Sequence, residues 1–146
     1  MPLRHEPAIA MFRQAIEFQR AAETLLLGAE TGAVLLPFLY VVHHAIELYL
    51  KAFILLHSPT EPIRIHDIVH LFDRSVELGL KPSDPVARGS IVMLSSADEK
   101  NNLRYFDMAK RLTIPSFVAL ISLLHALRSD IEPFVARPDK VARKGS

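Results

Sequence analysis

Residues 33–57 read AVLLPFLYVVHHAIELYLKAFILLH and form the most hydrophobic stretch of the 146-residue chain. Apolar side chains occur on nearly every side of a helix drawn through this stretch, which is typical of a helix surrounded by others. Its length would also suit a membrane span, but Glu47 and Lys51 lie in its middle, preceded by His43 and His44. Each charge at the centre of a bilayer would cost roughly 2.5–3.5 kcal/mol. We therefore expect the buried central helix of a soluble bundle, without a membrane span.

Four further helices are indicated around this central segment. Apolar periodicity and the positions of Pro, Gly and capping residues predict them at about 7–27, 66–78, 85–104 and 115–133. The loop Ser58-Pro-Thr-Glu-Pro62 ends the central helix, because two closely spaced prolines prevent its continuation. On the third predicted helix, we expect four side chains to face inward: Ile68, Leu71, Phe72 and Val76.

The pattern as a whole predicts an all-α, up-and-down bundle of four to five helices. Short loops, few glycines and no internal repeat favour a single domain over residues 1–146. We expect its core to cover about residues 7–135 and a polar tail to occupy residues 136–146.

The composition excludes several classes of function. Seventeen basic and sixteen acidic residues give a net charge of +1, so there is no overall positive field for coating nucleic acid. The absence of cysteine excludes disulfides, thiolate metal sites and cysteine nucleophiles. The N-terminal segment MPLRHEPAIAMF lacks the apolar core of a signal peptide. We therefore expect a cytoplasmic protein.

Residues 43–72 read HHAIELYLKAFILLHSPTEPIRIHDIVHLF, and this segment resembles the signature of the HEPN family. That signature is a helix with an A-x-E-x-x-L-K-A core, a short loop, and His-Asp opening the next helix. The matching residues here are Ala45, Glu47, Leu50, Lys51 and Ala52, followed by His66, Asp67 and Leu71. Further along, Asn102-Leu-Arg-Tyr105 resembles the Arg-Tyr element of the family.

The resemblance implies a helical bundle that is often a homodimer. Many members of the family are RNA-cleaving toxins or defence proteins, and many are paired with a minimal nucleotidyltransferase. Active members carry an Arg followed a few residues later by a His, and these residues from two subunits meet at the dimer interface. They need neither metal nor cofactor, because His transfers protons near neutral pH while Arg neutralises the phosphate.

The chain departs from the family at this Arg–His motif. Arg104 stands where the Arg is expected, but no His follows it before His125. Arg64 and His70 have the right spacing, yet they lie earlier, where the central loop joins the third helix. The departure favours a domain that binds without cutting.

Glu47 and Lys51 are four residues apart on the central helix, in the orientation that favours an ion pair. One interpretation is a buried pair that fixes helix packing. Another places Glu47 beside His43, four residues earlier, as a His–carboxylate dyad in a polar pocket. The two could also be metal ligands, but the spacing supplies no third ligand, and we predict no metal site.

His66 and Asp67 open the third helix, and two interpretations of them remain open. They could bond the free amides of the first turn. Alternatively, His66 could lie at the mouth of a cleft near Arg104, as a proton-transferring or phosphate-contacting group.

Arg104 belongs to the one local cluster where basic and aromatic residues mix. It could pair with Asp67 or Asp107 as a structural residue. As a binding residue it would contact phosphate together with Lys110 and Arg111, and Tyr105 could stack on a base.

Three functions are consistent with these residues. The first is a HEPN-like domain that binds nucleotide, RNA or a partner protein such as a nucleotidyltransferase, without catalysis, in a toxin–antitoxin or defence-type system. The second is a metal-independent endoribonuclease that uses Arg104 and His66 as catalytic residues across a dimer. The third is a structural dimerisation module.

Overall fold

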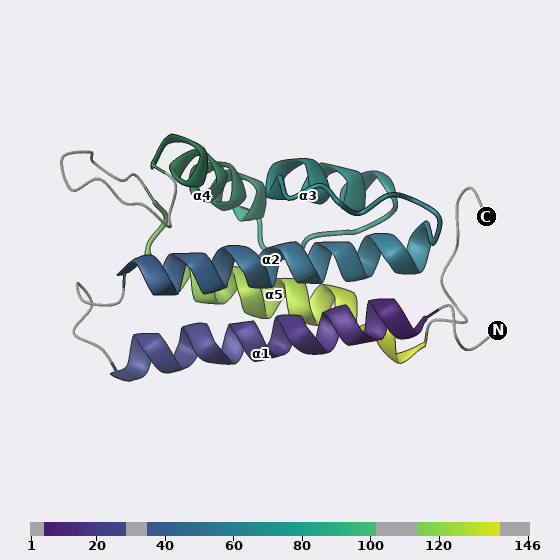
Figure 1. The fold of residues 1–146 in the computed structure, drawn as a ribbon, viewed down its shortest axis with the longest axis horizontal. Helices are drawn as coiled ribbons and strands as arrows, with labels where there is room; N and C mark the ends of the chain where they lie inside the picture. Colours follow the sequence, from purple (N-terminus) through teal and green to yellow (C-terminus); the bar gives the residue numbers. More distant parts are fainter. Residues whose placement is uncertain (1–4, 29–34, 102–113, 138–146) are drawn as a thin grey trace.

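The chain folds into α-helices. The computed structural model describes residues 5–28, 35–101 and 114–137, and over these ranges there are five helices and no β-strand. They are α1 (Glu6–Gly28), α2 (Leu35–His57), α3 (Ile68–Glu77), α4 (Ala87–Asn101) and α5 (Phe117–Ala136) (Figure 1). The prediction of an all-α bundle of four to five helices is confirmed.

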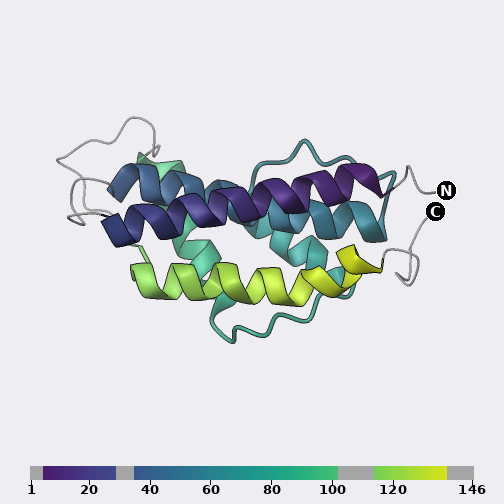
Figure 2. The ribbon, with the colours of Figure 1, turned by 90° about the horizontal axis from the view of Figure 1, so that it is seen from below.

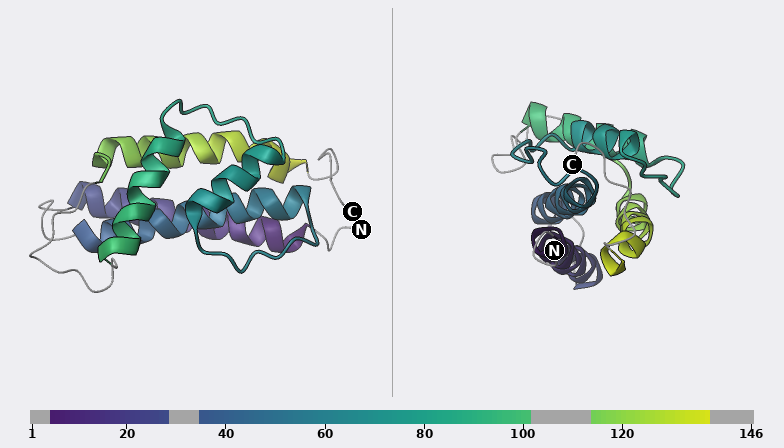
Figure 3. Two further views of the ribbon diagram at one scale, coloured as in Figure 1. Left: turned by 90° about the horizontal axis from the view of Figure 1, so that it is seen from above. Right: turned by 90° about the vertical axis from the view of Figure 1, so that its right-hand side faces the viewer.

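Three long helices and two short ones make up the bundle. α1 and α2 run antiparallel along most of their length, and α5 packs against both of them (Figure 1, Figure 2). α3 and α4 cross α2 on the side away from α1 (Figure 3). α2 therefore lies at the centre and contacts every other helix.

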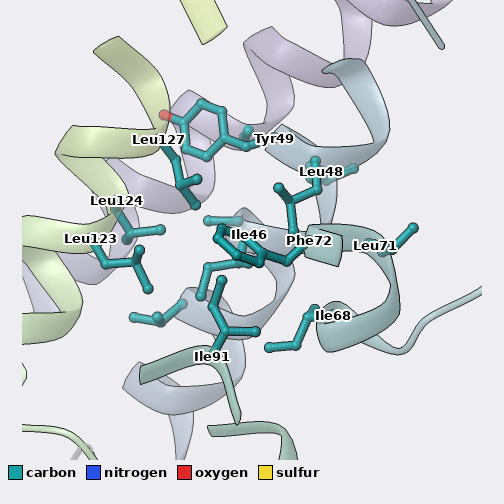
Figure 4. Packing of buried hydrophobic residues seen from close by; sticks show 14 of the residues in the cluster. Ile46, Leu48, Tyr49, Ile68, Leu71, Phe72, Ile91, Leu123, Leu124 and Leu127 are labelled. Carbon is teal, nitrogen blue, oxygen red and sulfur yellow. The ribbon is translucent and has the colours of Figure 1, made fainter. Parts of the chain in front are cut away.

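The central position of α2 explains its composition. By length and hydropathy alone α2 could cross a membrane, and no other helix in the described ranges could; 72% of its apolar window is buried against the rest of the chain. Around Ile46 of α2 pack side chains from three other helices, among them Phe72, Ile91 and Leu124 (Figure 4). Burial of such side chains stabilises the fold by about 1.5–3 kcal/mol each.

α3 ends in a tight turn that directs the chain toward α4. The N–H of Gly79 donates to the carbonyl of Val76, and the N–H of Leu80 donates to the carbonyl of Ser75, at 3.0 and 2.9 Å. This pair of bonds is the Schellman motif, which places one residue in a left-handed conformation. Gly79 is that residue, with φ of +113°.

The prediction that Val76 faces the core is wrong. Val76 is 43% exposed, and the buried residues of α3 are Ile68, Leu71, Phe72 and Ser75. These four positions follow the spacing of one helical face, and Val76 lies past its edge. Ser75 can be buried because its hydroxyl donates to the carbonyl of Leu71 at 2.8 Å.

Several helix boundaries also differ from the prediction, among them those of α3 and α5. α3 begins at Ile68, two residues later than expected. α5 begins at Phe117, after Ser116 as N-cap, and continues through Pro133 to Ala136. Pro133 has no N–H to donate to the preceding turn, yet the helix continues past it, and the N–H of Arg137 donates to its carbonyl at 3.2 Å. Residue 136 therefore belongs to a helix, while residues 138–146 of the predicted tail lie outside the described residues.

Candidate functional site at the junction of α2 and α3

A buried ion pair lies in the middle of α2. The Nζ atom of Lys51 donates to Oε2 of Glu47 at 2.7 Å, and both side chains are only 8% exposed. Their spacing of four residues places them one helical turn apart on the same face. The predicted pairing of Glu47 with Lys51 is thus present, in its buried form. An isolated charge at this depth would cost several kcal/mol of stability, and the opposite charge of the partner offsets that cost.

His66 joins this pair from the loop before α3. Its Nδ1 atom lies 2.8 Å from the same Oε2 atom of Glu47, while 77% of the His66 side chain is exposed. Burial alone would raise the pKa of the Glu47 carboxyl, but the hydrogen bonds from Lys51 and His66 outweigh burial and hold the pKa below its usual value. Glu47 is therefore an ionised carboxylate at neutral pH. It has two hydrogen-bond partners, the buried Lys51 and the exposed His66.

Asp67 is the N-cap of α3. Its Oδ1 atom accepts hydrogen bonds from the N–H groups of Val69 at 3.0 Å and His70 at 3.4 Å. These N–H groups have no partner inside the helix, so a carboxylate at this position satisfies them and complements the helix dipole. Of the two interpretations left open by the sequence, capping describes Asp67. His66 makes a contact with Glu47 that neither interpretation included, and its predicted position near Arg104 stays a prediction because Arg104 lies outside the described residues.

The loop before His66 is attached to α3 by a second ion pair. Arg74 donates from Nε to both carboxylate oxygens of Glu61 at 2.8 and 2.9 Å, and from Nη2 to Oε1 at 2.6 Å. These bonds hold the pKa of Glu61 below its ordinary value. The loop must run back along α2, because Glu47 lies ten residues, or about 15 Å, before the end of the helix at His57. The pair between Glu61 and Arg74 fixes that return path.

The two neighbouring histidines of α2 lie one turn before Glu47. His43 is half-buried. The ring of His44 packs edge-on against Phe18 of α1, with 4.4 Å between ring centroids. His66 contacts the Glu47 carboxylate, and the pairing of His43 with Glu47 stays a prediction.

Four predicted site residues lie outside the described residues: Arg104, Tyr105, Lys110 and Arg111. Of the predicted site, the structure therefore brings together Glu47, Lys51 and His66, and it places Asp67 next to them. Within the described ranges, no three His, Asp or Glu side chains are grouped so that they could hold a metal ion.

A polar network between α1, α2 and α5 was not predicted from the sequence. The hydroxyl of Tyr49 donates to Oε1 of Gln19, whose Nε2 atom donates to Glu23 at 3.0 Å. His125 of α5 completes the network, with Nδ1 at 3.3 Å from Gln19 and Nε2 at 3.1 Å from Glu23. Burial raises the pKa of Tyr49.

Gln19 was the available sequence signal for this network. It falls on the apolar face of α1, between Ala15 and Ala22, where a polar side chain requires a partner. The network joins three helices on the side of α2 away from α3, so it is separate from the junction at Glu47 (Figure 3).

Comparison with known proteins adds no family to this description. No protein-family model, no curated protein and no solved structure matches the chain. The five-helix bundle and the contacts among Glu47, Lys51 and His66 are accordingly the observations from which a function can be argued.

Proposed function

We propose that this chain is a HEPN-like domain that binds nucleotide or RNA, or a partner such as a nucleotidyltransferase, in a toxin–antitoxin or defence-type system, without cutting RNA. The observation that carries the proposal is the hydrogen bond between His66 and Glu47. It joins the two halves of the segment that resembles the family, residues 45–52 on α2 and His66-Asp67 at the start of α3.

The charges around this junction support an anionic ligand. Arg64, His66 and His70 are all exposed within seven residues of chain. The nearby carboxylates of Glu47 and Asp67 are already occupied by hydrogen-bond donors of the protein. A phosphate group would meet the exposed guanidinium of Arg64 here, with no unpaired carboxylate of Glu47 or Asp67 beside it, which suits nucleotide or RNA.

Binding is favoured over cleavage by the sequence that follows Arg104. Residues 105–111 read YFDMAKR and contain no His that could act with Arg104 in the way of the active family members. The basic residues of this segment, Lys110 and Arg111, and the aromatic Tyr105 are suited to contact phosphate and base.

Fluorescence anisotropy with a labelled single-stranded RNA tests the binding proposal. We expect His66→Ala and Arg104→Ala each to weaken binding about tenfold, which corresponds to about 1.4 kcal/mol. Arg13→Ala, which changes an exposed residue of α1, is the matched control and should bind like the unchanged protein. Equal affinity in all four proteins would remove RNA and this site from the proposal.

A metal-independent endoribonuclease is the second candidate, and the His–carboxylate contact at Glu47 favours it. It requires RNA cleavage in EDTA that is lost in both His66→Ala and Arg104→Ala. Binding without cleavage by a protein shown to be dimeric supports the first candidate and excludes the second.

A further inference from the structure

The two nitrogens of the His66 ring have different surroundings. Nδ1 lies 2.8 Å from the Glu47 carboxylate, whose side chain is 8% exposed. The His66 side chain as a whole is 77% exposed, so the contact with Glu47 leaves most of the ring in solvent. The exposed part of the ring is the part that a ligand can reach.

The contact with Glu47 determines which nitrogen carries the proton. An ionised carboxylate only accepts hydrogen bonds, so Nδ1 must be the donor. A neutral imidazole has a single N–H group, and Nε2 therefore keeps its lone pair. The lowered pKa of Glu47 ensures that the carboxylate is ionised at neutral pH.

Lys51 is required for this arrangement, although its hydrogen bond goes to Glu47 and not to His66. It donates to the same Oε2 atom of Glu47, at 2.7 Å, and supplies the positive charge that allows Glu47 to be buried and ionised. Without Lys51, the hydrogen-bond partner left to Glu47 at this junction would be an exposed imidazole.

The backbone at His66 is held on both sides. On the C-terminal side, Asp67 caps α3 and Ile68 is fully buried. On the N-terminal side, Glu61 is fixed by Arg74 through three hydrogen bonds. An exposed side chain on such a backbone loses less conformational entropy on binding than one on a free loop.

From these contacts we propose that Glu47 and Lys51 are positioning residues that hold His66 in its Nδ1–H tautomer and present Nε2 to the ligand as an acceptor. The ligand group that meets Nε2 therefore carries a hydrogen, as a hydroxyl, an amine or a bound water does. This inference rests on the proposed function for the presence of a ligand, but the tautomer itself is a property of the free protein.

Nitrogen NMR of the histidine rings tests the tautomer without any ligand. In its neutral form, the ring of His66 should carry its proton on Nδ1. In Glu47→Leu/Lys51→Met, which replaces the ion pair by apolar side chains of similar size, the Nε2–H form should gain at the expense of Nδ1–H. The ring of His70, exposed on α3 four residues later, is the internal control and should be unchanged.

Two results would overturn the inference. The first is an Nε2–H form of His66 in the unchanged protein, which decides the matter even if the double variant does not fold. The second is an unchanged tautomer in both the double variant and Glu47→Gln. Failure of the proposed function would give a different result from failure of this inference. RNA would not bind, but the free protein would still show the Nδ1–H tautomer of His66.

Discussion

His66 and Glu47 are hydrogen-bonded at 2.8 Å although they are nineteen positions apart in the chain. The contact links the middle of the central helix to the loop residue that precedes the N-cap of α3, so that a buried carboxylate and an exposed imidazole form one unit. Lys51 completes the unit from within the bundle. The unit is at once a packing element and the best-defined candidate site in the described residues.

Removal of one partner from the buried ion pair should cost far more stability than removal of both. Lys51→Met leaves the Glu47 carboxylate buried with only His66 beside it, and we expect a loss of roughly 3 kcal/mol. The free energy of unfolding of the double variant Glu47→Leu/Lys51→Met should lie within about 1 kcal/mol of that of the unchanged protein. Urea denaturation measures both; a double variant as unstable as Lys51→Met would contradict the account.

Stability should fall as the solution is acidified below about pH 5. The folded pKa values of Glu47, Glu61 and Asp73 all lie below their ordinary values, so these groups stabilise the fold above the unfolded pKa and lose that contribution as pH falls through the folded pKa. Glu61→Gln removes one of them and should flatten the dependence of the unfolding free energy on pH. Glu17→Gln, on the exposed face of α1, is the control, and an equal flattening there would refute the assignment to Glu61.

Asp67→Ala should lower the free energy of unfolding by about 1 kcal/mol, because two N–H groups of α3 lose their acceptor. Asp67→Ser should retain most of the stability, since a serine hydroxyl also caps a helix. Thermal unfolding followed by circular dichroism compares the two. Equal midpoints for Ala and Ser would mean that capping is not the role of this carboxylate.

The two glycines at positions 79 and 89 should respond in opposite directions to alanine. Gly79→Ala should destabilise by about 1 kcal/mol or more, because φ of +113° strains any side chain at this position. Gly89 lies inside α4 and has open space where the Cβ of an alanine would stand, so Gly89→Ala should stabilise by about 0.5–1 kcal/mol. Calorimetry of the pair gives the sign of each; a stabilising Gly79→Ala would contradict the turn described after α3.

Much of the fold could be predicted because the relevant signals are local. Each of them lies within a few turns of chain: the apolar composition of α2, the prolines after His57, and the spacing of Glu47 and Lys51. Such local signals suffice to predict five helices, one of them central, and a buried ion pair. The predicted burial of Val76 was wrong because, in a short helix, the sequence leaves the edge of the apolar face uncertain by one position.

The candidate site could be predicted only in part, because it depends on the path of a loop. Residues 58–67 return along α2, and nothing in their sequence states how far they reach. Spacing on one helix could suggest His43 as a partner of Glu47, but it could not reveal His66, which the loop brings to the same carboxylate. The network at Gln19, Tyr49 and His125 was missed for the same reason, since its members come from three separate helices.

The central claim is that a ligand is bound at His66, and a titration of labelled protein with a short single-stranded RNA, followed through the histidine ring signals, tests it most directly. The account predicts saturable shifts of the His66 signals, with those of His125, across α2 in the other polar network, unchanged. Shifts confined to His125, or RNA binding that leaves the His66 signals in place, would contradict it.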